Sequence, residues 1–119
     1  MARGEPIRVE EQRMVKATFH HFGVPTSIKK GEETYLEGGK VYITDPEKHP
    51  FRVEFLRFDA DSPLPAELQS GPHAAFLVDS LDEALKDQEV ILPPFDATAE
   101  LRCAFIKDGD ALIEVMEKR

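Results

Sequence analysis

Hydrophobic and polar residues alternate along several short segments in the second half of the chain, which is the pattern of β-strands. In residues 73–79 the alternation places Ala74, Phe76 and Val78 on one face of a strand. Apolar side chains on one face are suited to packing against a helix, so we expect Phe76 to be buried there. The opposite face, which carries His73, should turn away from the helix layer.

A helix is predicted directly after this strand. Ser80 and Glu83 have the spacing of a capping box, in which the serine side chain accepts a hydrogen bond from the backbone three positions later. The apolar stripe of this helix would consist of Leu81, Ala84 and Leu85.

Three further strands are predicted in residues 89–92, 101–108 and 111–117. Pro93-Pro94 should end the first of them, because proline cannot donate a backbone hydrogen bond within a sheet. Asp108-Gly109 favours a tight turn between the other two strands, which therefore form a hairpin. The second half thus has the order β–α–β–β–β.

The first half repeats this order in a shorter form. Residues 17–26 predict a strand, and residues 41–44 and 51–58 predict a hairpin. Between them, residues 27–39 are polar and fit a weak helix or a loop equally well. Both halves open with a histidine-bearing strand and close with a strand whose single glutamate is flanked by hydrophobic residues. We therefore predict an internal duplication.

These boundaries divide the chain into an arm and one α+β domain. Residues 1–16 form an N-terminal arm whose pattern predicts no particular element. Residues 17–119 form the domain, in which module one spans 17–58 and module two spans 73–117. The connector, residues 59–72, holds three prolines and a glycine. Module one is expected to be truncated, with a missing or stunted helix.

The charge distribution limits the kinds of partner. The chain has 119 residues and a formal net charge of −8. Residues 1–60 carry 10 basic and 10 acidic side chains, whereas residues 61–119 carry 5 and 13, so the excess is confined to the second half. Such a surface does not attract phosphates, and we expect neither nucleic acid nor an anionic membrane as a partner. A small molecule is the expected ligand.

The sequence also indicates a cytoplasmic protein. No apolar run approaches the roughly 20 residues of a membrane-spanning helix, and the first residues lack the apolar core of a signal peptide. The single cysteine, Cys103, excludes an intramolecular disulfide and a cysteine-cluster zinc site. We expect its thiol to be buried and inert.

The candidate chemistry rests on His21, Glu54, His73 and Glu114, which occupy matched positions in the two modules. If the modules pack about a pseudo-twofold axis, all four side chains can point into one central groove. Two imidazoles and two carboxylates suit a divalent ion of the Mn, Fe, Co, Ni or Zn group. Without an ion the two carboxylates would repel each other, and one of them would be driven to take up a proton.

Other interpretations of these residues remain open. A single histidine on a strand is more often a hydrogen-bonded or solvent-facing residue than a ligand. Alternation places His20 on the face opposite His21, where a structural or exposed role is expected. Glu54 and Glu114 could be polar residues on the wet face of an antiparallel sheet, paired with Arg52 and Lys107.

The residues resemble those of the vicinal oxygen chelate superfamily, which includes glyoxalase I, extradiol dioxygenases, methylmalonyl-CoA epimerase and bleomycin-resistance proteins. The segment HAAFLVDSLDEAL followed by RCAFIKDGDALIEVME is similar to the second module of that family. HFGV, residues 21–24, resembles the start of its first module. The resemblance covers residues 17–117 and is weak in residues 26–39, where the family has a helix and another strand.

The resemblance implies paired βαβββ modules whose curled mixed sheets surround a metal-binding groove. Carried over by position, the metal ligands are His21, Glu54, His73 and Glu114. The implied chemistry is that of a divalent-metal-dependent lyase or isomerase that acts on a small oxygen-rich metabolite through an enediolate-type intermediate. Glu114 or Glu54 would be the catalytic base.

The resemblance also implies two alternative functions and a second copy of the chain as a partner. An extradiol-type dioxygenase would use two histidines and one carboxylate, so a fourth ligand counts against it. A metal-free binding protein of the bleomycin-resistance type would sequester a drug or metabolite, although 8% aromatic residues and no tryptophan give little for a stacking pocket. A homodimer is the expected assembly.

Overall fold

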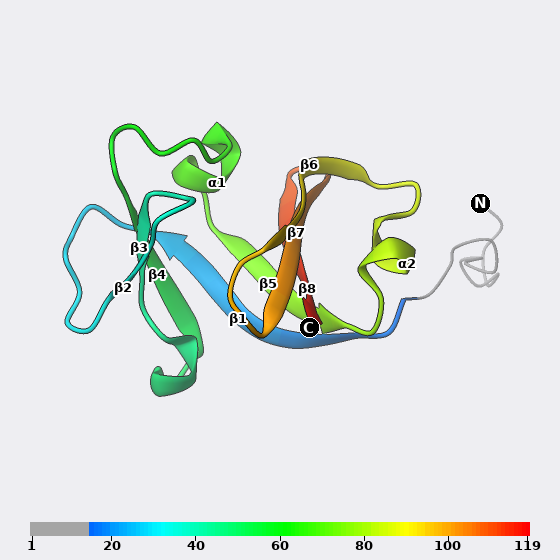
Figure 1. Cartoon of the computed structure of the whole chain (residues 1–119), viewed down its shortest axis with the longest axis horizontal. Coiled ribbons are helices and arrows are strands. Elements are labelled where there is room, and N and C mark those ends of the chain that lie inside the picture. Colours follow the sequence, from blue (N-terminus) through cyan, green and yellow to red (C-terminus); the bar gives the residue numbers. More distant parts are fainter. Residues whose placement is uncertain (1–14) are drawn as a thin grey trace, which may run out of the picture.

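A single curled sheet of eight strands forms the framework of the protein in a computed structural model that describes residues 15–119 (Figure 1). Residues 1–14, which make up most of the arm, lie outside the described part. The elements, in chain order, are β1 (Ala17–Pro25), β2 (Thr34–Leu36), β3 (Val41–Ile43), the 3-10 turn η1 (Pro46–Lys48), β4 (Val53–Phe58), α1 (Ala66–Ser70), β5 (His73–Val78), α2 (Leu81–Leu85), β6 (Glu89–Asp96), β7 (Leu101–Asp108) and β8 (Ala111–Lys118).

The order of strands across the sheet reveals two similar halves. The order is β2-β3-β4-β1-β5-β8-β7-β6, so each half places its first strand at the centre and its last strand beside it. β1 pairs with β4 in parallel, and β5 pairs with β8 in parallel. The two halves meet where β1 and β5 run antiparallel. This arrangement confirms the α+β fold class with paired modules in a curled mixed sheet.

Module two has the predicted β–α–β–β–β order. Ser80 Oγ accepts a hydrogen bond from the Glu83 backbone at 3.2 Å, as the capping box requires. The backbone N–H of Leu81 also donates to a carboxylate oxygen of Glu117 from β8 at 2.7 Å, so α2 is tied to the sheet at its first turn. β7 and β8 form the predicted hairpin, and Gly109 takes a φ of +61°, which favours glycine.

Two apolar clusters lie on opposite faces of module two. The outer face, on which α2 packs, contains Val78, Leu81, Ala84, Ala104 and Val115. The inner face contains Ala75, Cys103 and Met116. Burial raises the pKa of the Cys103 thiol, so this side chain is a buried, neutral member of the core, as expected.

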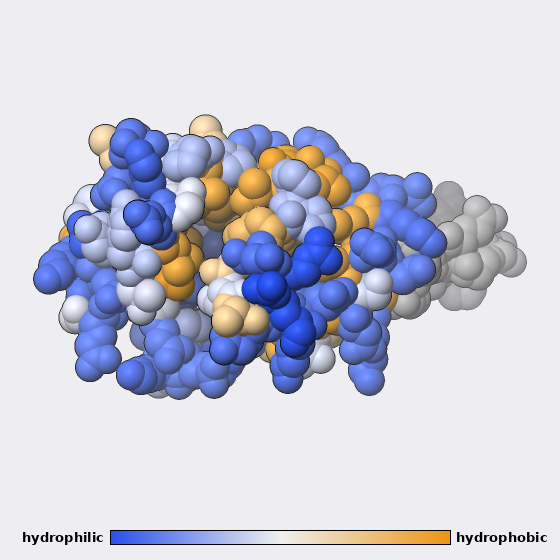
Figure 2. Space-filling view, viewed as in Figure 1, coloured by the Kyte–Doolittle hydropathy of each residue, from blue (hydrophilic) through white to orange (hydrophobic). Residues whose placement is uncertain are grey.

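Strand β6 does not end where the sequence predicts. It continues through Pro93-Pro94 to Asp96, with irregular pairing to β7 between Val90 and Leu92 and again between Leu92 and Phe95. β6 lies at the edge of the sheet, so the prolines need no hydrogen-bonding partner on the solvent side. Apolar side chains of this part of the chain reach the surface over β6 (Figure 2).

Module one keeps all four strands. Part of the polar segment 27–39, which was expected to be a weak helix or a loop, forms the strand β2 instead, and β2 pairs with β3. Residues 26–33, all within the described chain, contain no helix. The connector instead contains α1, whose Leu68 is fully buried. Within residues 15–119 each α-helix has five residues, which is too short to cross a bilayer.

Candidate metal centre

The register of the two central strands brings His21 and His73 to the inner face of the sheet. His21 of β1 lies opposite Ala75 of β5, and His73 of β5 lies opposite Gly23 of β1. Each histidine therefore faces the residue two positions beyond the other one. The imidazole centroids lie 5.9 Å apart, and both side chains are buried.

Gly23 is required by the close approach of the His73 ring. A Cβ atom at this position would lie 2.0 Å from Cε1 and 2.3 Å from Nε2 of His73. The ring of His73 is held on its other side by an edge contact with Phe105, at 5.0 Å between centroids. The glycine of the HFGV segment thus provides the space in which one candidate ligand sits.

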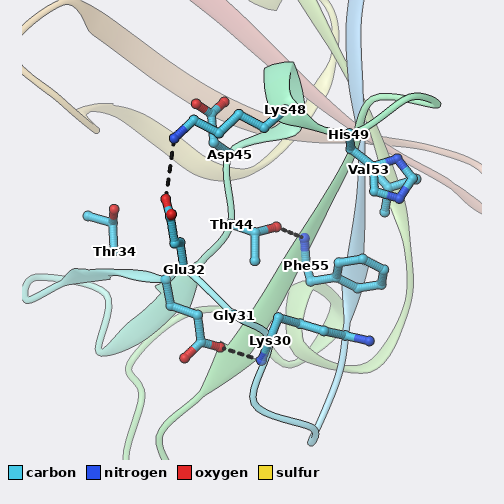
Figure 3. A pocket seen from close by; sticks show the side chains of 11 residues that line it. Lys30, Gly31, Glu32, Thr34, Thr44, Asp45, Lys48, His49, Val53 and Phe55 are labelled. Atoms are coloured by element: carbon cyan, nitrogen blue, oxygen red, sulfur yellow. Dashed lines mark hydrogen bonds and ion pairs between the residues drawn. The ribbon is translucent and has the colours of Figure 1, made fainter.

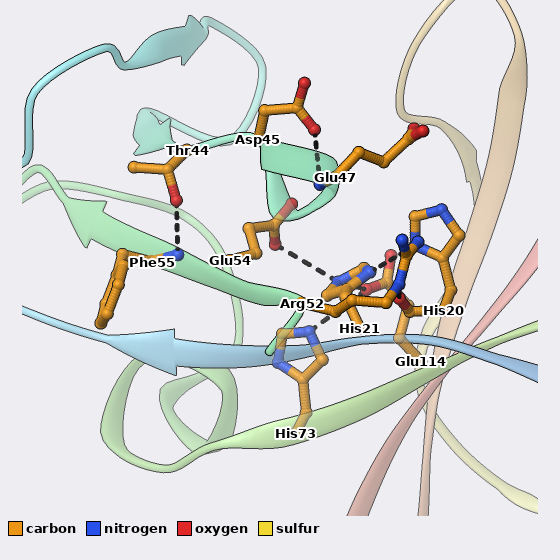
Figure 4. Close-up of polar contacts among 10 residues, drawn as sticks. All are labelled: His20, His21, Thr44, Asp45, Glu47, Arg52, Glu54, Phe55, His73 and Glu114. Carbon is orange, nitrogen blue, oxygen red and sulfur yellow. Dashed lines mark hydrogen bonds and ion pairs between the residues drawn. The ribbon is translucent and has the colours of Figure 1, made fainter. Parts of the chain in front are cut away.

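The two glutamates come from the strands that flank the central pair. Glu54 of β4 is in register with Gly23, and Glu114 of β8 is in register with Ala75. Because parallel neighbours point the same way at paired positions, both carboxylates project from the inner face toward the histidines (Figure 4). All four residues selected from the sequence are therefore brought together by the structure.

The donor atoms lie at separations typical of ligands that share one ion. His21 Nε2 lies 3.5 Å from Glu54 Oε1 and 3.5 Å from Glu114 Oε1, while His73 Nε2 lies 3.2 Å from Glu114 Oε1. Ligand atoms about 2.1 Å from a metal ion are about 3.0–3.4 Å apart at bond angles between octahedral and tetrahedral values. The ligand atoms of His21, Glu54 and His73 all lie within 4.8 Å of one another.

The electrostatics of the cluster couple the histidines to the carboxylates. Burial acts to lower the pKa of His21, but the adjacent carboxylates of Glu114 and Glu54 outweigh it and raise the pKa to about 9. Burial acts to raise the pKa of Glu114, but the imidazoles of His21 and His73 outweigh it and lower the pKa to about 2. The metal-free cluster is thus held together by a proton on His21.

The same atoms fit a divalent ion. Among the described residues, His21 Nε2 is buried and has no partner within hydrogen-bonding geometry, although two carboxylate oxygens face it. A buried nitrogen in this position is costly unless a proton or a cation bridges it to the carboxylates. Two imidazoles and two carboxylates are donors that suit ions of the Mn-to-Zn group.

The structure places His20 differently from the prediction. β1 contains a bulge between Phe19 and His21, so one extra residue, His20, is inserted opposite β5. The bulge shifts the alternation: Phe19 pairs with Phe76 on the outer face, while the rings of His20 and His21 touch, with Nδ1 atoms 2.8 Å apart. Two adjacent histidines are the only sequence signal of this arrangement.

The outer face of module one is also less covered than the alternation predicts. Phe22 is 48% exposed, Phe19 is 40% exposed, and Phe76 is only half-buried, with its ring 5.9 Å from that of Phe19. No helix in the described part of module one covers its outer face as α2 covers the outer face of module two. The expected deep burial of Phe76 is therefore wrong.

An open cavity of about 760 Å³ lies away from the metal centre, on the outer side of β4 (Figure 3). Val53 and Phe55 line it, and they alternate with Glu54, which points to the other side. The ammonium group of Lys30 lies 4.4 Å from the centre of the Phe55 ring. Residues 30–34, which belong to the segment that fits a weak helix or a loop, form much of its wall.

Comparisons with known proteins support the fold. No model of a protein family matches the chain, and no curated protein matches it. A hypothetical protein from Bacillus halodurans superposes with a TM-score of 0.67 at 18% identity, over 87% of this chain and 96% of that one. Methylmalonyl-CoA epimerase from Mycobacterium tuberculosis superposes with a TM-score of 0.58 at 16% identity, over 91% of each chain. Both superpositions show a shared fold, and this confirms the fold that the sequence predicts.

Proposed function

We propose that this protein is a divalent-metal-dependent isomerase or lyase of the vicinal oxygen chelate type, which acts on a small oxygen-rich metabolite. The observation that carries the proposal is the position of His21 Nε2, which lies 3.5 Å from a carboxylate oxygen of each module. The fold shared with methylmalonyl-CoA epimerase supports an enzyme of this superfamily.

His21, Glu54, His73 and Glu114 would hold the ion. The ion would bind adjacent oxygens of the substrate and stabilise the negative charge that develops on them when a neighbouring carbon loses its proton. The charges of the two carboxylates would balance a divalent cation, so the buried cluster would carry no net charge. Zn, Ni, Co, Mn and Fe all remain candidates.

The two glutamates are the residues that we propose to move protons. They project from β4 and β8, on either side of the central pair β1 and β5. A carboxylate on one side of a bound substrate can remove a proton, and a carboxylic acid on the other side can return one. Removal of the proton by one glutamate and its return by the other would invert a carbon centre. Elimination would instead follow when one glutamate removes the proton from a substrate whose adjacent carbon carries a leaving group, which departs with its bonding electrons as the double bond forms.

Metal content is the measurement that tests the proposal. The protein, purified without a histidine tag, is incubated with each of the five ions and analysed by elemental mass spectrometry. We expect about one ion per chain in the wild type and less than a tenth of that in His73→Ala and Glu114→Ala. Stoichiometric metal in both variants would show that the ligand set is wrong.

Activity is tested next with the metal-loaded protein. Exchange of a substrate proton with deuterated solvent, followed by NMR for 2-oxoaldehyde thiol adducts and 2-substituted thioesters, detects proton transfer before the complete reaction is known. Glu54→Gln and Glu114→Gln keep the shape of the side chain but remove the base, and we expect exchange to fall by about 10²–10⁴-fold. Unchanged exchange in both variants would contradict their catalytic role.

A ring-cleaving dioxygenase is the second candidate because the His21, Glu54 and His73 triad has the two-histidine, one-carboxylate composition of non-haem iron sites. Oxygen uptake by the Fe(II)-loaded protein with catechol would favour it. No bound ion under any condition would instead favour a metal-free protein that binds a small molecule.

A further inference from the structure

We infer that His20 is a positioning residue of the metal centre, whose ring accepts the Nδ1 proton of His21 and so presents Nε2 of His21 to the ion. The inference rests on the proposed function, because it requires a metal ion between the four ligands. Neither the alternation of the sequence nor the resemblance assigns any such role to His20.

The contact between His20 and His21 indicates which ring nitrogen of each histidine carries a proton when a metal ion is bound. His21 Nε2 faces Glu54 and Glu114, and a nitrogen that binds a metal ion must offer a lone pair. A neutral imidazole then carries its proton on Nδ1. The atom 2.8 Å from His21 Nδ1 is His20 Nδ1, so His20 must be the acceptor and must carry its own proton on Nε2.

The bulge that creates this contact is held in place by the turn before β4. Arg52 Nε donates a hydrogen bond to the backbone oxygen of His20, and the backbone N–H of Phe22 donates to the oxygen of Arg52 at 2.9 Å. Arg52 adopts a φ of +56°, a strained conformation for a residue other than glycine. The backbone on both sides of His21 is therefore fixed by one residue of the turn that leads into the parallel strand β4.

The surroundings of His20 are compatible with a neutral acceptor. His20 is half-buried, and its ring makes an edge contact with His21 at 5.0 Å between centroids. Arg52, Glu47 of η1 and Glu114 are the charged groups that act on the ring (Figure 4). Outer-shell groups that hold a metal-binding histidine in this way usually affect metal affinity by about 10–100-fold.

A matched pair of variants tests the inference. The asparagine of His20→Asn keeps a hydrogen-bond acceptor near the position of Nδ1. The leucine of His20→Leu has almost the same shape as asparagine but offers no acceptor. Zn²⁺ affinity is measured by competition with a chromophoric chelator, and melting of the metal-free proteins shows whether each variant is folded. We expect His20→Leu to bind Zn²⁺ about 10–100-fold more weakly than the wild type, and His20→Asn to bind within about threefold of it.

Each outcome has a distinct meaning. The acceptor role of His20 is overturned if His20→Leu binds zinc as tightly as the wild type, or if both variants bind it equally weakly. The proposed function stands in either case, because the wild type still binds zinc. If the wild type binds another of the five ions and not zinc, the two variants are compared with that ion. A wild type that binds none of the five ions overturns the proposed function and this role together.

Nitrogen-15 NMR of the zinc-loaded wild type gives a test that does not depend on a variant. We expect the Nδ1 of His21 to be protonated, its Nε2 to be bound to zinc, and the Nδ1 of His20 to be unprotonated. A proton on Nδ1 of His20 in the zinc-loaded protein would overturn the inference.

Discussion

Two small residues, Gly23 and Ala75, occupy equivalent places in the two modules and make the metal centre possible. Each lies opposite the candidate histidine of the other module and beside the candidate glutamate of its own. The ring of His73 lies so close to Gly23 that a Cβ atom cannot be accommodated. The site therefore depends on small side chains at these two positions as much as on the atoms that would bind the metal.

Gly23→Ala should displace the ring of His73, because the added methyl group would lie 2.0 Å from Cε1. We expect zinc affinity to fall by at least about tenfold, as for loss of correct ligand orientation. Isothermal titration calorimetry measures the change. Gly31→Ala is the control, since a Cβ atom there meets nothing within 4 Å. Wild-type affinity in Gly23→Ala would contradict the proposed position of His73.

The stability of the metal-free protein should depend on pH through His21 and Glu114. The pKa of His21 is raised from 6.5 to about 9, so its stabilising contribution is complete below pH 6.5 and is lost as the pH rises through 9. The pKa of Glu114 is lowered from 4.5 to about 2, so its contribution is present above pH 4.5 and is lost as the pH falls through 2. The free energy of unfolding should therefore be greatest between pH 4.5 and pH 6.5, where both contributions are complete.

Urea unfolding of the metal-free protein between pH 5.5 and 9.5 measures the alkaline part of this dependence. A pKa shift of this size corresponds to a loss on the order of 3 kcal/mol in the free energy of unfolding. His21→Gln cannot carry the proton, and its unfolding free energy should change much less over the same range. Equal slopes for the two proteins would show that His21 is not protonated in the fold.

Among the elements, the two modules differ in what covers the outer face of the sheet. In module two, α2 packs Leu81 and Ala84 against Val78, Ala104 and Val115. In module one, the loop 26–33 crosses the equivalent region and leaves an open cavity over Val53 and Phe55. The sheet itself is continuous, so the inner face keeps its geometry although one helix is absent from the described part of module one.

Leu81→Ala should destabilise the protein by about 2–5 kcal/mol, because this side chain is fully buried between α2 and the sheet. Ile28→Ala is the matched control, since Ile28 is 64% exposed in the loop of module one and should cost less than about 0.5 kcal/mol. Chemical unfolding followed by circular dichroism measures both. Similar losses in the two variants would contradict the assignment of α2 as the main cover of the outer face.

Across the molecule as a whole, the four candidate ligands come from strands that are distant in the chain and adjacent in the sheet. The order β4-β1-β5-β8 places Glu54, His21, His73 and Glu114 on neighbouring strands across the line where the modules meet. A site of this kind exists only when both modules are folded and joined. Metal binding should therefore be coupled to the integrity of the whole sheet.

The homodimer remains a prediction, and the outer face supplies a surface with which to test it. Phe19 and Phe22 are both exposed, and their rings contact each other at 4.8 Å. We expect analytical ultracentrifugation to give twice the chain mass of 13.4 kDa for the wild type and a single chain for the double variant Phe19→Ser, Phe22→Ser. Ile28→Ser, which changes another exposed apolar residue, should stay dimeric. A wild type of one chain mass would contradict the prediction.

Most of module two and the identity of the four candidate ligands could be predicted from the amino-acid sequence alone. Period-two alternation, the Ser80 capping box and the Asp108-Gly109 turn are local signals, and local interactions dominate the elements that they predict. The internal duplication matches His21 with His73 and Glu54 with Glu114, because equivalent positions in a repeat share the same face.

Features that depend on neighbouring strands follow from tertiary contacts instead. β6 passes Pro93-Pro94 because it lies at the edge of the sheet, and β2 forms because β3 pairs with it. The bulge at His20 exists because Arg52, 32 positions later, holds the backbone oxygen of His20. A contact over that separation has no signature in the local pattern. The same bulge turns His20 toward His21 and Phe19 toward Phe76, and so decides which side chains adjoin the metal centre.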